Sequence, residues 1–233
     1  MQSSDATRQK QSALLGLGGV VLLVGALRGH GALPKPEELV SSACVLGAAL
    51  LAHQGADEQR GAVTGPLAAG MTCGLLGDIM LSNLLPLPSK AAVPLGMVTF
   101  GSGHLAYLRA FQALAKQRNL ASATPLVIAL VSYQALTALV WQRWLRNDDE
   151  PLLSYGALAY GVLLAAMAGT GTGLALHDRR RALLAVGGTL FVASDLLLGA
   201  RLLRALRFRG HDNLIWLSYI VGQALIVWGA SED

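Results

Sequence analysis

Charge is scarce in this chain of 233 residues. Only 14% of the residues are Asp, Glu, Lys or Arg, 53% are hydrophobic, and the mean hydropathy is +0.49. Because a soluble domain carries about 25% charged residues, this composition excludes an ordinary soluble protein and indicates a membrane protein. The net charge of +4 lies in short loops without interleaved aromatic residues. This pattern favours lipid headgroups as partners and argues against nucleic acid.

Cysteine is also scarce. Cys44 and Cys73, the two cysteines, lie in apolar segments and have neither disulfide nor metal-ligand spacing. We interpret them as small buried hydrophobic residues. No cluster of His, Cys, Asp or Glu has the spacing of a metal site, so we expect no metal and no cofactor. We also expect no cleavable signal peptide, because the first apolar run follows a polar tail and has no small-residue cleavage site.

Long apolar segments are what the sequence has in abundance. A helix needs about 20 apolar residues to cross a bilayer, and such segments recur at 12–27, 37–53, 62–82, 91–115, 122–142, 152–175, 182–203 and 212–230. Short turns containing Pro, Asp, Asn and basic residues separate them. The sequence therefore predicts an all-α fold: a single integral membrane domain over residues 1–233, with about eight transmembrane helices and a polar N-terminal tail at residues 1–11.

The membrane and the orientation follow less directly from the sequence. We expect the cytoplasmic membrane if the protein is bacterial and the endoplasmic reticulum if it is eukaryotic. Lys and Arg divide evenly between the two sides of the predicted bundle, so the positive-inside rule favours neither orientation.

Two carboxylates interrupt the apolar segments. Asp78 lies in GLLGDIML and Asp195 in GGTLFVASDLLLG, whereas the other acidic residues fall in termini, predicted loops or helix ends. A carboxylate at the centre of a membrane helix costs about 2.5–3.5 kcal/mol on insertion scales, so such residues usually have a function. The alternative is that each one hydrogen-bonds to a neighbouring helix and does no more.

Helix geometry places the two carboxylates at a similar depth. With a rise of about 1.5 Å per residue, Asp78 lies roughly 9 Å and Asp195 roughly 13 Å from the helix end on the side away from the chain termini. On the same rise, Tyr219 lies roughly 10 Å from that side. Tyr219 and Gln223 are four residues apart and share a helical face. A shared depth favours a joint site over two separate structural contacts.

Nearby polar residues have both a structural and a functional interpretation. His104 and Tyr107 come out deeper, at roughly 20 Å or more. Together with Phe100 and Phe111 they have the spacing of a packed helix face, and a lone histidine on such a face is more often a hydrogen-bonded core residue than a ligand. Ser194 could bond only to the carbonyl four residues before it.

The order of these motifs resembles that of the YhhN-type lysoplasmalogenases, an eight-span membrane family. The similar elements are Gly77-Asp78, Gly96-x3-Phe100-x3-His104-x2-Tyr107-x3-Phe111, Tyr160 with Met167, Gly188-x2-Phe191-x2-Ser194-Asp195, and Tyr219-x3-Gln223. The resemblance covers roughly residues 70–227. It implies a lysoplasmalogenase, a hydrolase that cleaves the vinyl-ether bond of a choline or ethanolamine lysoplasmalogen to a fatty aldehyde and a glycerophospho-base. The partners it implies are this lysophospholipid and membrane lipids, and nothing in the sequence points to a particular protein partner.

Two aspartates suit that chemistry. Cleavage of an enol ether begins with protonation of its β-carbon, which leaves an oxocarbenium ion for water to attack. A carboxylic acid shielded from water keeps its proton to higher pH and can supply it. A second, ionised carboxylate can stabilise the cation and accept a proton from water, as in glycosidases. We therefore expect Asp78 and Asp195 to be catalytic, with either one as the acid.

The remaining expectations concern substrate binding. We expect the following residues to bind the substrate: His104, Tyr107, Ser194, Tyr219, Gln223, Lys35 and Arg201. The cations Lys35, Lys90, Arg201 and Arg204 lie on the side nearer the carboxylates, where a phosphate would gain charge pairing and hydrogen bonds. Interfacial anchoring of these cations is the alternative.

Two other function classes stay open. A proton-coupled transporter also uses intramembrane carboxylates, although the two halves of this chain show no convincing inverted repeat. A lipid-binding membrane protein without catalytic activity would need no pair of carboxylates at matched depth. Release of aldehyde by the purified protein, without a membrane gradient, separates the enzyme from both.

Overall fold

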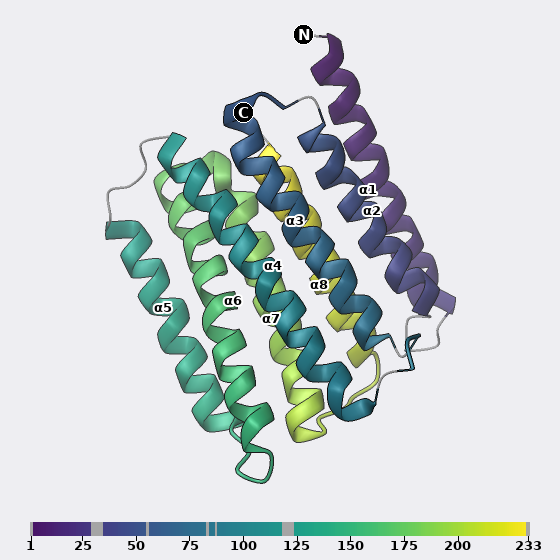
Figure 1. Ribbon diagram of the computed structural model, residues 1–233, viewed down its shortest axis with the longest axis vertical. Coiled ribbons are helices and arrows are strands. Elements are labelled where there is room, and N and C mark those ends of the chain that lie inside the picture. The colour runs from purple at the N-terminus through teal and green to yellow at the C-terminus, as the bar shows by residue number, and fades with distance from the viewer. Residues whose placement is uncertain are drawn as a thin grey trace.

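A computed structural model describes residues 2–28, 35–54, 56–82, 84–86, 88–117 and 124–231, which form an all-α bundle (Figure 1). The α-helices are α1 (Gln2–Arg28), α2 (Lys35–His53), α3 (Glu58–Leu81), α4 (Ser89–Gln117), α5 (Thr124–Val140), α6 (Pro151–His177), α7 (Ala182–Arg204) and α8 (His211–Ser231). A π-helical turn, η1 (Trp141–Leu145), continues α5, and a 3-10 turn, η2 (Arg179–Arg181), precedes α7. No strand occurs among these residues, and the predicted all-α membrane bundle is confirmed.

The helices coincide with the predicted apolar segments, but they are not equally apolar. Within the described residues, six helical stretches are long and apolar enough to cross a membrane on their own, and α2 and α4 are not among them. In α2 the reason is visible: Glu38, Ser41 and Ser42 are all buried. Polar side chains that face other helices lower the hydropathy of a segment without meeting lipid.

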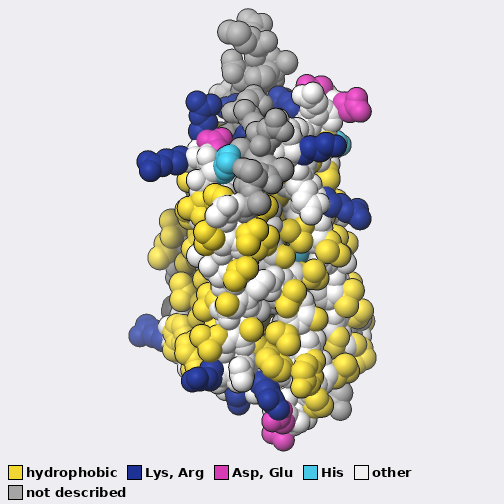
Figure 2. Space-filling view, turned by 90° about the vertical axis from the view of Figure 1, so that its left-hand side faces the viewer, with side chains coloured by type: hydrophobic (Ala, Val, Ile, Leu, Met, Phe, Trp, Pro, Cys, Tyr) yellow, Lys and Arg dark blue, Asp and Glu magenta, His cyan; other side chains and the backbone are white. Residues whose placement is uncertain are grey.

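The surface of the bundle is banded. Figure 2 shows a broad hydrophobic belt between two ends where Lys, Arg, Asp and Glu gather. The helix α5 contributes strongly to the belt, since Val127, Val131 and Leu139 each expose half or more of their surface. An exposed apolar band between charged ends is the arrangement that a bilayer stabilises.

Most of the predicted polar N-terminal tail is helical. The tail is predicted at residues 1–11, and α1 begins within it at Gln2. Gln11 is buried, and its Nε2 donates to the carbonyl oxygen of Ala48 in α2 at 3.0 Å. The backbone hydrogen bonds of a helix do not need an apolar sequence, so a helix can extend past the membrane border.

Both chain ends lie toward the top of Figure 1, and a close contact joins α7 and α8 between that end and the carboxylates. The helices α7 and α8 cross at a pair of glycines. A Cβ atom at Gly187 would lie only 2.7 Å from the carbonyl oxygen of Gly222. Because glycine has no such atom, the two backbones can approach. This contact brings the helix that carries Asp195 against the helix that carries Tyr219.

Candidate active site

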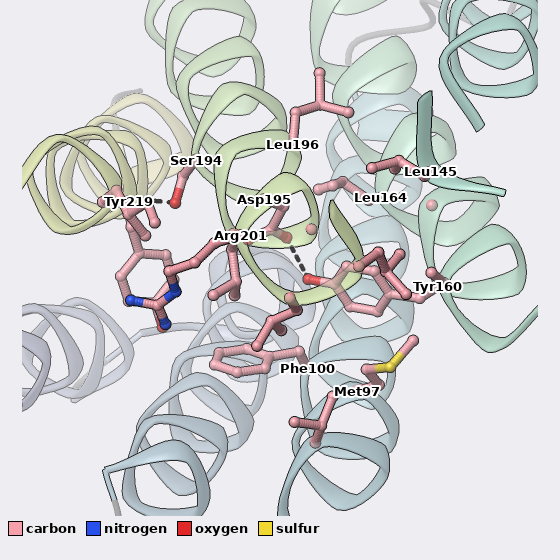
Figure 3. A pocket seen from close by; sticks show the side chains of 18 of the residues that line it. Met97, Phe100, Leu145, Tyr160, Leu164, Ser194, Asp195, Leu196, Arg201 and Tyr219 are labelled. Carbon is pink, nitrogen blue, oxygen red and sulfur yellow. Dashed lines mark hydrogen bonds between the residues drawn. The ribbon is translucent and has the colours of Figure 1, made fainter. Parts of the chain in front are cut away.

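A cavity lined by helices α2 to α8 contains both intramembrane aspartates. Asp78 is near the C-terminal end of α3 and is buried, while Asp195 in α7 is half-buried. In Figure 3, Asp195 and Tyr160 point toward each other from α7 and α6. The two predicted carboxylates therefore face one shared space in the interior of the bundle.

The carboxylate of Asp78 is held by donors from two other helices. The hydroxyl of Ser42 in α2 donates to its Oδ2, and the hydroxyl of Tyr219 in α8 donates to the same oxygen at 3.1 Å. Gln223 Nε2 in turn donates to the Tyr219 hydroxyl oxygen at 2.8 Å. An amide nitrogen can only donate, so the Tyr219 proton is directed to Asp78. Asp78 is thus held as a hydrogen-bond acceptor.

A glycine makes this arrangement possible. Gly74 lies one helical turn before Asp78 on α3. A Cβ atom at Gly74 would lie 2.8 Å from Gln223 Nε2 and 3.2 Å from the hydroxyl oxygen of Tyr219. Such contacts would force both side chains to move. The absence of a side chain at this position lets α8 place its polar groups beside Asp78.

The surroundings of Asp195 are different. The hydroxyl of Tyr160 in α6 donates to Asp195 Oδ2, and His104 Nε2 in α4 lies 3.0 Å from the same hydroxyl. His104 is fully buried, and its Nδ1 has no hydrogen-bond partner among the described residues. A hydroxyl both donates and accepts, and a histidine ring nitrogen can do either. The row Asp195–Tyr160–His104 can therefore reverse the direction of its hydrogen bonds when the His104 proton changes between Nε2 and Nδ1.

Aromatic rings connect the two carboxylate networks. Phe191 packs edge-on against Tyr219 at a centroid distance of 5.1 Å and against His104 at the same distance. Phe100 meets Tyr219 edge-on at 6.1 Å, and both of these rings line the cavity. Aromatic faces attract a cation, so this layer suits a reaction in which positive charge develops between the carboxylates.

Charged groups also lie at the cavity wall. Arg201 of α7 lines the cavity and pairs through Nη1 with the carboxylate of Asp212 in α8. Glu38 of α2 lines it as well and is only 2% exposed. Within the described residues, no group of three or more His, Cys, Asp and Glu side chains could hold a metal ion.

The comparison with known families fits this architecture. The model of the YhhN family matches residues 37–230. The chain belongs to the YhhN family. No curated protein and no solved structure gives a significant match. The YhhN match begins well before the span of the sequence resemblance and takes in nearly all of α2, including Glu38 and Ser42.

Several residues expected to bind substrate line the cavity of this YhhN chain, and others contact residues that line it. Ser194, Arg201 and Tyr219 line the cavity, together with Asp78 and Asp195. The Ser194 hydroxyl donates to the carbonyl of Ile215 in α8 at 3.0 Å, rather than to its own helix. His104 and Gln223 each contact a lining tyrosine and reach the carboxylates through it. His104 was expected to lie deeper than the carboxylates, and the side chain of Tyr160 connects it to Asp195.

Tyr107 is not part of the cavity wall. Its hydroxyl donates to the sulfur of Met71 at 3.2 Å, and its ring occupies the space beside Gly70, where a Cβ atom would lie 2.1 Å away. Tyr107 therefore packs between α3 and α4, outside the cavity wall, and its contact with substrate stays a prediction. Its position on the helix face shared with His104 did not reveal that its side chain turns toward α3.

The expected cations have different surroundings. The side chains of Lys35 and Lys90 lie outside the described part of the structure. Arg204 lies outside the cavity wall and donates to two backbone carbonyls, those of Trp144 at 2.6 Å and Arg146 at 2.8 Å. Arg201 is the predicted phosphate-binding cation whose described side chain reaches the cavity.

Three residues were not among the site residues predicted from the sequence but lie at the cavity or bond a carboxylate: Tyr160, Glu38 and Ser42. Tyr160 belongs to the motif that resembles the family, yet nothing in its spacing indicated a bond to Asp195. Glu38 was grouped with the acidic residues at helix ends, but it is buried because the first turn of α2 packs inside the bundle. The signal was present: Glu38 and Ser42 are four residues apart and share a helix face.

Proposed function

We propose that the protein is a lysoplasmalogenase. It hydrolyses the vinyl-ether bond of a choline or ethanolamine lysoplasmalogen to a fatty aldehyde and a glycerophospho-base. The observation that carries the proposal is a single cavity lined by two carboxylates whose hydrogen-bond partners differ in kind. Membership of the YhhN family, which is known for this activity, supports it.

Asp195 is the general acid in this proposal. The acid must begin each turnover with its proton, so a partner of the acid must be able to accept a hydrogen bond from it. When Asp195 is ionised, Tyr160 donates to it and His104 donates to Tyr160 from Nε2. When Asp195 is protonated, it donates to Tyr160, and Tyr160 donates to Nε2 of the His104 tautomer that carries its proton on Nδ1. The row therefore accommodates both states through a change of the His104 tautomer. A proton held in this way can be given to the β-carbon of the enol ether.

Asp78 is the base and the stabiliser of the cation. Two hydroxyls donate to its Oδ2, and the amide of Gln223 fixes the direction of one of them. An ionised carboxylate can accept both of these hydrogen bonds. An ionised Asp78 can face the oxocarbenium ion and accept a proton from the attacking water.

The proton transfers close into a cycle. Asp195 protonates the β-carbon, and the resulting cation adds water at the carbon bonded to oxygen while Asp78 takes a proton from that water. The product is a hemiacetal. When it breaks, its hydroxyl proton returns to Asp195 and Asp78 protonates the departing glycerol oxygen. One water is consumed, one carbon–oxygen bond is broken, and both carboxylates return to their starting states.

Aldehyde release by the purified protein tests the proposal. The protein in detergent, without a membrane gradient, is given a choline lysoplasmalogen, and aldehyde and glycerophosphocholine are measured. We expect the two products in equal amounts. The matched controls are the saturated ether and the ester with the same chain and headgroup, which have no enol ether to protonate and should release no aldehyde. A folded wild-type protein that releases none from the vinyl ether would overturn the proposal in favour of transport or lipid binding.

A further inference from the structure

The cavity extends well beyond the carboxylates, and its two ends differ in chemistry. The helix α2 contributes Glu38 to its wall, and α3 with its C-cap residue contributes Asp78 and Ser82, whereas α4, α5, η1 and α6 contribute a mostly apolar arm that also contains Thr137. Residues of this arm include Met97, Val140, Trp141, Leu145, Ala157 and Leu164. In Figure 3, Met97, Leu145 and Leu164 lie on the Tyr160 side of Asp195, and Ser194, Arg201 and Tyr219 lie on the other.

The π-helical turn η1 forms one wall of the apolar arm. Its extra residue is marked by the bond from the Arg146 amide to the carbonyl of Trp141 at 2.7 Å. Trp141 and Leu145 line the cavity, while Trp144 between them is 69% exposed. The indole nitrogen of Trp141 donates to the carbonyl of Ser154 at 2.8 Å. Its polar atom is satisfied there, and the ring can serve as apolar surface. Turns of this kind occur often at functional sites.

The arm begins beside the proposed acid. Tyr160, which donates to Asp195, is followed at once by Gly161, and Ala157 precedes Gly161 by one helical turn on the same face. On α7, Gly199 lies one turn after Asp195, and a Cβ atom there would be 3.6 Å from Leu145 of η1. The space next to Asp195 is thus continuous with the apolar wall.

The order of groups in a vinyl ether indicates which end of the substrate lies toward each carboxylate. In a vinyl ether the β-carbon carries the hydrocarbon chain, and the other alkene carbon carries the oxygen that leads to glycerol and phosphate. The group that protonates the β-carbon must therefore lie toward the chain. Asp195 lies toward the apolar arm, and Asp78 lies with the polar groups, where water and the headgroup belong.

We propose that the apolar arm between α4, α5, η1 and α6 binds the hydrocarbon chain of the substrate and sets the length of chain that is accepted. The proposal rests on the proposed function for the identity of the lipid. The headgroup then lies at the opposite end of the cavity, toward Arg201. The proposed occupant is the one hydrocarbon chain of this lysophospholipid.

A pair of matched substitutions on α6 tests the arm through turnover. Ala157 lines it, whereas Ala159 is exposed on the same helix outside the cavity wall. Each buried methylene is worth roughly fourfold in affinity, so Ala157→Leu, by shortening the arm, should raise KM for a chain of about sixteen carbons at least tenfold. It should change KM for a chain of about eight carbons much less. Ala159→Leu should leave both values near those of the wild type. Equal loss on the two chains in a folded Ala157→Leu protein would overturn the proposal.

A second measurement needs neither turnover nor a variant. A saturated ether lysophosphocholine with a diazirine at the end of its chain is bound to the wild-type protein in vesicles and irradiated, and labelled peptides are mapped. Excess saturated ether lipid without the diazirine should compete away label in the α5–η1 segment. Competable label confined to α8 or α2 would overturn the proposal. Label in α5–η1 from a protein that releases no aldehyde would retain the chain site while the proposed function fails.

Discussion

The two carboxylates of the cavity have the same chemistry but different surroundings. Asp78 is buried among α2, α3 and α8, and its partners, Ser42 and Tyr219, are oriented to donate to it. Asp195 is half-buried between α6 and α7, and its partner Tyr160 continues to His104 in a row that can reverse. The difference shows how one bundle can hold two aspartates in two roles: a donor of fixed direction suits a carboxylate that begins the turnover ionised, and a reversible partner suits one that begins it protonated.

Removal of either carboxylate has the largest expected effect. Asp195→Asn and Asp78→Asn should each lower kcat for vinyl-ether hydrolysis by about 10²–10⁴, because a positioned acid or base contributes that much. Thermal unfolding in detergent should show stability unchanged or higher, since an ionisable group in hydrocarbon is unfavourable to the fold. If the carboxylates only tie helices together, Asn hydrogen-bonds nearly as well and activity persists.

The pH profile separates the two roles. Wild-type kcat should fall at high pH as Asp195 loses its proton and at low pH as Asp78 gains one, which gives a bell-shaped profile. The residual activity of Asp195→Asn should lack the fall at high pH, and that of Asp78→Asn should lack the fall at low pH. The opposite pattern would exchange the two assignments.

Removal of one hydroxyl from each network should give a smaller, unequal effect. A hydrogen bond to a charged group contributes about 1.5–3 kcal/mol, so Tyr160→Phe should lower kcat by about tenfold to a hundredfold. Tyr219→Phe leaves the Ser42 hydroxyl on Asp78 and should cost less than about tenfold by the same measure. Steady-state kinetics on the folded variants measures both. Equal losses would mean that the two surroundings do not differ in function.

Glycine substitutions test whether the networks depend on close packing. Gly74→Ala would press on Gln223 and Tyr219, and overpacking of this kind typically costs about 1–3 kcal/mol. We expect a lower unfolding temperature and reduced kcat. Gly101→Ala, in α4, would meet Leu163 at an ordinary 3.5 Å, and in a helix Ala is favoured over Gly by about 0.5–1 kcal/mol. It should leave stability unchanged or raised. Similar destabilisation by both would show that packing beside Asp78 is not special.

The last expected effect concerns the headgroup, and it falls on KM rather than on kcat. Arg201→Gln should raise KM about tenfold with little change in kcat, because a hydrogen bond to a charged group such as phosphate contributes about 1.5–3 kcal/mol. Arg207 is exposed at the same end of the bundle and outside the cavity wall, so Arg207→Gln is the matched control and should leave KM near the wild-type value. An unchanged KM for Arg201→Gln would leave Arg201 as a partner of Asp212 alone.

Much of the fold could be predicted from the sequence, because lipid imposes one strong requirement on it. Backbone groups in a bilayer must bond within their own segment, so each long apolar run is a helix. The same reasoning isolates Asp78 and Asp195, since a carboxylate in an apolar run is costly wherever it points. The order of motifs was specific enough to indicate the family. These conclusions depend on local properties of the chain.

The tertiary structure decided the partners of each carboxylate, because contacts between helices depend on rotation and crossing, which one-dimensional patterns do not specify. Spacing placed Tyr107 and His104 together, yet the packing of α3 on α4 turns Tyr107 to Met71, while α6 brings Tyr160 to His104. The burial of Glu38 and the bond from Ser42 to Asp78 likewise depend on how α2 packs against its neighbours. The sequence by itself determined that two acidic groups lie in the membrane bundle. Only the packing decided that one has fixed donors and the other a reversible row, because side chains from other helices make those bonds.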